Sequence, residues 1–258
     1  MRLMKRILSA AAVLALSASL LVGCSSGTAS SVPVSASSAA ESTVSSVEET
    51  ASSAVDENAA AAAQLLNDLT GSYQELWPVI LADEYKQTWL DDCTALVGEE
   101  NAEAAFEKLS SMVTSDVYGE DAVEAYANGG GAYFCGFTNS LATLTFDGET
   151  STISGTDKDG NVLFSHTYHY IGMEPVHGLY EFESDDADSG EFTYFVLAPD
   201  TSAETYHIEF RYGSDAEALS QYDAGEYAYW VASGISTDCD QTMIDNCIEL
   251  FCTENLAG

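Results

Sequence analysis

Apolar residues recur every three or four positions between residues 58 and 128, which is the period of α-helices with one buried face. Pro78 should mark a break or a first turn, because proline has no N–H to donate within a helix. Gly98-Glu99 and Gly119-Glu120 place an acidic residue at an expected helix start, where the helix dipole favours negative charge. The apolar positions that carry the period are Leu65, Leu66, Leu69, Leu76, Val79, Ile80, Trp89, Leu90, Cys93, Ala105, Phe106, Leu109 and Met112.

From residue 129 to 213 the pattern changes to short alternating runs separated by turn residues, which is typical of β-strands. Asp147-Gly148 and Asp159-Gly160 have the composition that type I′ hairpin turns prefer. Consecutive strands joined by hairpins favour an antiparallel barrel or sandwich over a parallel sheet. Strands are expected near residues 132–137, 141–146, 150–156, 162–170, 178–184, 191–198 and 205–212.

Helices are expected again in the last part of the domain, 214–258. Ser214-Asp215 resembles a capped helix start, and 240–255 carries one apolar face formed by Met243, Ile244, Cys247, Ile248 and Phe251. We therefore predict a single α+β domain over 58–258, in which a helical part (58–128) and closing helices flank an antiparallel β-barrel part (129–213).

The N-terminus has the pattern of an export signal. Basic residues precede an apolar run over 7–22 that is too short to span a membrane comfortably and contains three serines. The run ends in Leu21-Val22-Gly23-Cys24, which resembles the lipobox of bacterial lipoproteins; an ordinary signal peptide with an incidental cysteine is the alternative. We expect a signal peptide at 1–23, lipid attachment at Cys24, and a disordered Ser/Ala-rich tether over 24–57. The domain would then be extracytoplasmic and anchored to a bacterial membrane.

The charge of the chain excludes a nucleic-acid partner. The whole chain has 7 basic and 42 acidic residues, and removal of the signal peptide would leave only four basic residues, for a net charge of −38. Phosphate backbones would be repelled by such a surface. Apart from Cys24 there are five cysteines, an odd number, without the spacing of a zinc ribbon.

Candidate metal ligands lie on the run 205–212. Alternation puts His207, Glu209 and Arg211 on the polar face of this predicted strand, and His207 and Glu209 are close enough to reach one ion. The alternative is a solvated strand face on which Arg211 pairs with Glu209. Neither a nucleophile motif nor a phosphate-binding loop nor a metalloprotease motif is present, so we do not expect an enzyme.

Three segments resemble, in order, the ZinT family of exported zinc-binding proteins: GSYQELWP (71–78), HGLYEFE (177–183) and FTYFVLAPDTSAETYHIEFRYG (192–213). The resemblance implies a calycin-like, lipocalin-type barrel with helices packed around it. It also implies zinc binding and a transporter partner, because the domain is found fused to zinc-transporter binding proteins.

The three zinc-binding histidines of the family correspond here to Phe195, Thr205 and His207, of which only His207 is a histidine. Glu209, Glu204 or a histidine from a neighbouring strand would have to complete the site, because zinc prefers three or four N, S or carboxylate ligands. The resulting hypothesis is a domain that binds a divalent metal ion, zinc, for sequestration or delivery to a transporter. The alternative is a lipocalin-like module that binds an organic ligand or a protein partner, without metal.

Overall fold

The computed structural model describes residues 57–128, 131–198 and 207–256. Within these residues, eight antiparallel strands form a closed barrel in which each strand pairs with the next and β1 pairs with β8. This confirms the predicted α+β class with an antiparallel barrel flanked by helices. The strands are β1 (Gly71–Glu75), β2 (Thr143–Asp147), β3 (Thr152–Thr156), β4 (Val162–Met173), β5 (Tyr180–Ser184), β6 (Tyr194–Leu197), β7 (His207–Gly213) and β8 (Ala232–Ser236).

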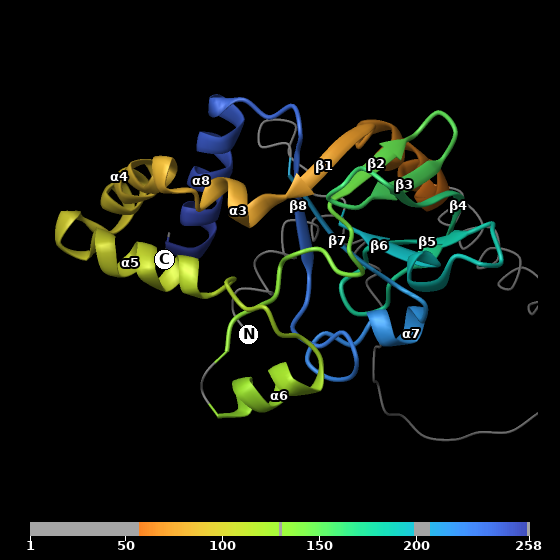
Figure 1. Cartoon of the computed structure of the whole chain (residues 1–258). Coiled ribbons are helices and arrows are strands. Elements are labelled where there is room, and N and C mark those ends of the chain that lie inside the picture. The colour runs from red at the N-terminus through yellow and green to blue at the C-terminus, as the bar shows by residue number, and fades with distance from the viewer. Residues whose placement is uncertain (1–56, 129–130, 199–206, 257–258) are drawn as a thin grey trace, which may run out of the picture.

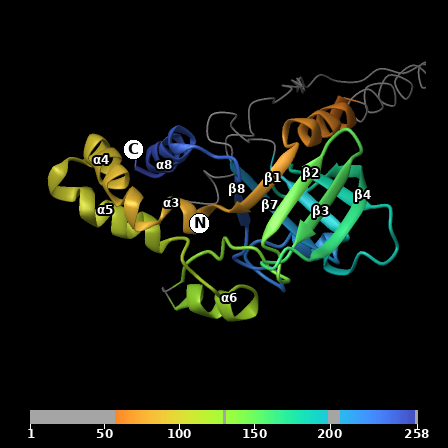
Figure 2. The same cartoon turned by 45° about the horizontal axis from the view of Figure 1, so that its top comes forward.

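The helices gather mainly on one side of the barrel, beside β1 and β8 (Figures 1 and 2). Trp89 is fully buried there, with its ring edge-on to Phe251 at 5.7 Å between centroids. Residues 57–68 are helical as well. The other helices are α3 (Leu76–Ile80), α4 (Lys86–Val97), α5 (Glu99–Ser111), α6 (Glu120–Ala127), α7 (Ala216–Leu219) and α8 (Gln241–Leu256), with short 3-10 turns η1 (Asp83–Tyr85) and η2 (Gly190–Phe192).

The predicted helix signals act as the sequence suggested. Pro78 lies within the five-residue helix α3, and α5 and α6 begin directly after Gly98 and Gly119, both of which have positive φ. Asp215 caps α7 by accepting a hydrogen bond from the N–H of Ala218 at 3.0 Å. No helix in the described part of the chain is both long and apolar enough to cross a membrane.

The barrel interior is packed with large side chains. Cross-strand pairing puts Phe182, Phe195 and Tyr212 side by side on the inner face of β5, β6 and β7. The rings of Phe195 and Tyr212 lie 5.4 Å apart in a stacked arrangement. The buried interior positions are Tyr73, Leu144, Phe146, Ile153, Phe164, Tyr168, Phe182, Phe195, Leu197, Ile208, Phe210 and Tyr212.

The barrel draws strands from outside the predicted β segment. β1 lies in the part predicted to be helical and β8 in the part predicted as closing helices, so the barrel extends beyond 129–213 at both ends. Residues 132–137 do not form a strand; the N–H of Phe134 donates to the carbonyl of Tyr229, and Phe134 makes only isolated bridges. The backbone of this segment bonds instead to residues distant in sequence, among them Met112 and Ser233 of β8.

Both Asp-Gly hairpins form, but not with type I′ turns, which need positive φ at both central residues. Of the two pairs only Gly160 has positive φ. The Asp147 carboxylate instead accepts hydrogen bonds from the N–H groups of Glu149 and Thr150, a local side-chain arrangement that closes the turn. The predicted signal peptide, Cys24 and most of the tether lie outside the described residues.

Candidate functional site

His207 and Glu209 lie on the outer face of β7, on the side of the strand opposite the buried interior residues Ile208, Phe210 and Tyr212. His207 pairs with Ile235 of β8, and Glu209 is the next outward position along the strand. The barrel fixes both backbones, so the two side chains start from neighbouring points on a rigid sheet.

Helices α3 and α8 cover this outer face. His207 and Glu209 line a cavity of about 30 Å³ together with Cys247 and Glu254 from α8. Cys247 and Glu254 are two turns apart on the helix and therefore share one face. The remaining lining residues are Leu76, Trp77, Ile80, Leu250 and Phe251. The cavity thus combines an imidazole, a thiol and two carboxyl groups within apolar walls.

Burial shifts the pKa values of the histidine and the thiol that line this cavity. It lowers the pKa of His207 to about 4, so the imidazole is neutral at neutral pH, the form in which histidine binds metals. Burial, followed by the charges of Glu209, Cys239 and Glu254, raises the pKa of the Cys247 thiol to about 12. Burial and Glu209 also raise the pKa of the Cys135 thiol. The Glu209 charge therefore contributes to the raised pKa of two buried thiols, Cys247 and Cys135.

The donor set suits zinc, but its arrangement does not yet form a coordination site. Zinc takes nitrogen, thiolate and carboxylate ligands, and each of these types lines the cavity. Across the described ranges, no three His, Cys, Asp or Glu side chains already converge closely enough to hold an ion. Glu204 and Thr205, which the resemblance places nearby, lie outside those ranges.

The site implied by the family resemblance is not reproduced. Phe195 faces the barrel interior and is fully buried, whereas His207 faces outward, so two of the three corresponding positions lie on opposite faces of the sheet. No other histidine is in the cavity lining. His166 and His169 bond to Asp186 and Asp185 respectively, each at 2.7 Å.

Arg211 is completely buried rather than part of a solvated face. Its guanidinium donates hydrogen bonds to the backbone carbonyls of Leu219, Gln221 and Tyr227. It also lies over the ring of Tyr222, 4.3 Å from the centroid. The alternative interpretation of this strand as a solvated face with an Arg211–Glu209 pair is therefore wrong, because the 216–230 segment covers the Arg211 end of β7.

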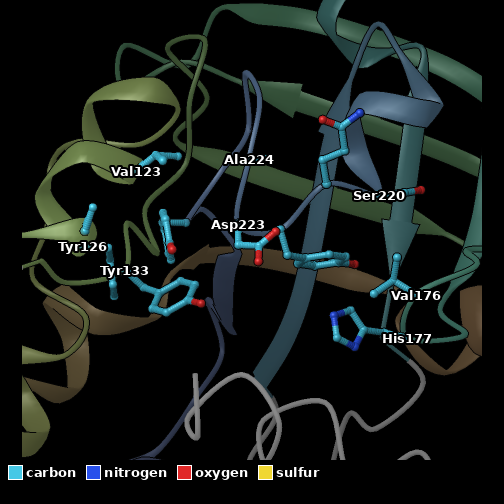
Figure 3. A pocket seen from close by; sticks show the side chains of 12 residues that line it. Val123, Tyr126, Tyr133, Val176, His177, Ser220, Asp223 and Ala224 are labelled. Atoms are coloured by element: carbon cyan, nitrogen blue, oxygen red, sulfur yellow. The ribbon is translucent and has the colours of Figure 1, made fainter.

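The same segment forms part of the lining of a second and much larger pocket, of about 680 Å³ (Figure 3). Four tyrosines line it. The rings of Tyr126 and Tyr229 stack at 3.8 Å, and Tyr133 meets both edge-on. The other lining residues are Val123, Ala127, Val176, His177, Ser220, Gln221, Tyr222, Asp223 and Ala224. Sequence reasoning missed this pocket because its residues come from four segments that share no motif.

All five cysteines of the described residues are free thiols, and four of them are buried. The Cys93 and Cys252 sulfurs nevertheless lie 3.9 Å apart in the buried contact between α4 and α8. The five cysteines therefore comprise one close pair and three separate thiols.

Comparison with known proteins gives only distant structural similarity. No family profile matches the chain, and no curated protein matches its sequence. The zinc-bound ZinT-like domain of Streptococcus pneumoniae AdcA is similar at 15% identity over 70% of this chain and 87% of that domain, with a TM-score of 0.44. Zinc-bound AdcA from the same organism is similar at 13% identity over 71% of this chain and 34% of that chain, with a TM-score of 0.41. Both scores are below 0.5, so the assignment of the fold rests on the strand pairing of this chain.

Proposed function

We propose that this protein is an extracytoplasmic lipoprotein whose domain binds a divalent metal ion, zinc, at His207 and Glu209. Cys247 and Glu254 supply the further ligands from α8. The observation that carries the proposal is the meeting of these four side chains at one small cavity between β7 and α8. Within the proposal, the lipid at Cys24 holds the domain at a membrane, where it sequesters zinc or delivers it to a transporter component.

The chemistry of the cavity supports zinc over a hard cation such as calcium or magnesium. Calcium and magnesium prefer oxygen ligands, whereas an imidazole and a thiol are ligands that zinc accepts readily. His207 already has the neutral form that coordination requires. The Cys247 thiol would release its proton to solvent on coordination, because a bound divalent cation outweighs the burial and the nearby carboxylates that raise the pKa of this thiol.

Metal binding would require small movements of side chains on α8 toward β7. The two halves of the ligand set come from different elements, the barrel and the closing helix. A bound ion would therefore join α8 to the barrel, and zinc should raise the thermal stability of the domain by linkage.

The test is a zinc titration of the full chain, stripped with EDTA, against a competing chromophoric chelator at neutral pH. We expect one tightly bound zinc per chain, and an affinity at least about tenfold lower for His207→Ala, since it removes a first ligand. His169→Ala is the matched control, because His169 is an exposed histidine of β4 that already bonds to Asp185. The proposal fails if wild type retains no more zinc than His207→Ala.

The thiol gives an independent readout. Cobalt(II) in place of zinc should produce a near-ultraviolet thiolate-to-metal absorption that Cys247→Ser abolishes and Cys239→Ser leaves intact. If wild type binds cobalt without this absorption, Cys247 is not a ligand and the α8 half of the proposed site is refuted.

A further inference from the structure

The 680 Å³ pocket lies apart from the cavity at His207 and shares no lining residue with it. In Figure 3, Asp223 projects into the middle of the view, with Tyr126 and Tyr133 on one side and Val176 and His177 on the other. The pocket therefore has aromatic walls and a carboxylate between them. An apolar concavity with a few convergent polar groups is the usual form of a small-molecule site.

The charges around the pocket are suited to a cation. Among its described lining residues there is no lysine or arginine, and Asp223 is the one acidic residue. Burial is the largest effect on His177 and lowers its pKa, so the imidazole contributes no positive charge at neutral pH. The chain as a whole carries a net charge of −35, which raises the local concentration of any cation.

The wall already holds one cation against an aromatic ring. Arg211 lies over Tyr222 from behind the pocket, and the ring of Tyr222 meets that of His177 edge-on at 4.3 Å. Two backbone N–H groups, those of Val176 and His177, donate to the buried carboxylate of Glu174, which fixes the loop that carries His177. The negative charge of Glu174 also offsets the positive charge of Arg211, so Arg211 adds little positive potential to the pocket.

The opposite wall is equally well fixed. Tyr126 comes from α6, whereas Tyr229 lies in the 216–230 segment, whose backbone is held by the hydrogen bond from the Tyr229 N–H to the Tyr222 carbonyl. Burial raises the pKa of Tyr126 to about 12, so the phenol stays neutral at neutral pH. Asp223 lines the same pocket as Tyr133, so the carboxylate lies beside the aromatic cluster.

We infer that this pocket binds an organic cation, a quaternary ammonium or protonated amine compound, between the tyrosine rings and the Asp223 carboxylate. The facing sides of Tyr126 and Tyr229 are stacked on each other, so the ring surfaces turned to the pocket supply cation–π attraction and dispersion. The carboxylate neutralises the charge. The inference does not depend on metal binding, since neither His207 nor any other residue of the proposed metal site takes part.

The test uses calorimetric titration of the full chain with choline and benzyltrimethylammonium, in EDTA and at physiological ionic strength. The uncharged carbon analogue of choline, 3,3-dimethylbutan-1-ol, is the neutral probe. We expect saturable binding of both cations and at least about tenfold weaker binding of the alcohol, the ratio that a desolvated cation–π contact provides. Because EDTA removes zinc, the outcome of the separate zinc titration does not alter this result.

Two pairs of variants separate the pocket from the overall charge. Asp223→Asn should weaken cation binding about fivefold without changing that of the alcohol, whereas Asp159→Asn, which removes one carboxylate from the exposed β3–β4 hairpin, should change neither. Tyr126→Leu should weaken the binding of both cations, whereas Tyr85→Leu, in η1, should leave it unchanged. The inference is overturned if neither cation saturates, if the alcohol binds as tightly, or if the two aspartate variants have equal effects.

Discussion

Replacing His207 by glutamine should remove a pH dependence of stability from this domain. The imidazole of an unfolded chain takes up a proton near pH 6.5, whereas burial lowers the folded-state pKa to about 4. Between these values the unfolded state binds more protons, so the free energy of unfolding falls as the pH falls. At about 1.4 kcal/mol per pKa unit, the full shift amounts to at most about 3 kcal/mol.

The assay is urea unfolding of metal-free wild type and His207→Gln between pH 7.5 and 4, values chosen to bracket the shift. Other titrating groups are common to both proteins and cancel in the difference. The wild type should lose up to about 3 kcal/mol more than the variant over this range, and His169→Gln should behave like wild type. Parallel loss of stability in wild type and His207→Gln would refute the reasoning, as would an NMR titration that finds His207 protonating near pH 6.5.

Two further predictions concern buried contacts. Arg211→Met should lower the free energy of unfolding by about 3 to 5 kcal/mol in urea titrations, because three buried carbonyl groups lose their donors; a loss below about 1 kcal/mol would contradict this. Oxidation with diamide, which takes up the two thiol hydrogens, should join Cys93 to Cys252, whose sulfurs are 3.9 Å apart. Peptide mapping without reduction should find this cross-link in wild type and in Cys239→Ser, and its absence from both would show that the α4–α8 contact does not bring the thiols together.

The helices could be predicted well because their apolar period is long and their ends carry glycine and acidic residues. β1 and β8 could not, and the reasons differ. β1 has a single buried residue, Tyr73, and is flanked by helical segments, so it adds little to an alternating pattern. Four of the five residues of β8 are buried, and most are small. A strand covered on both faces has no period of two to detect.

Only the half of the candidate site that lies on β7 could be predicted from the sequence. Alternation along β7 suffices to place His207 and Glu209 on the same face. Whether that face meets water or protein depends on α8, whose position is a tertiary property. Cys247 and Glu254 share one face of α8, but the sequence does not indicate that this face packs against β7. The aromatic pocket likewise depends on the approach of distant segments, such as Tyr126 to Tyr229.

The pairing of β1 with β8 has a consequence for how the chain can fold. These strands come from opposite ends of the described domain, and each supplies one edge of the seam that closes the barrel. When the chain emerges with its N-terminus first, from a ribosome or across a membrane, β1 has no partner on its β8 side until Ala232–Ser236 has emerged. During that interval the backbone donors and acceptors of an open edge are available to other chains. Closure should therefore be a late, long-range event in folding, and changes that weaken β8 should promote aggregation during folding more than they destabilise the finished barrel.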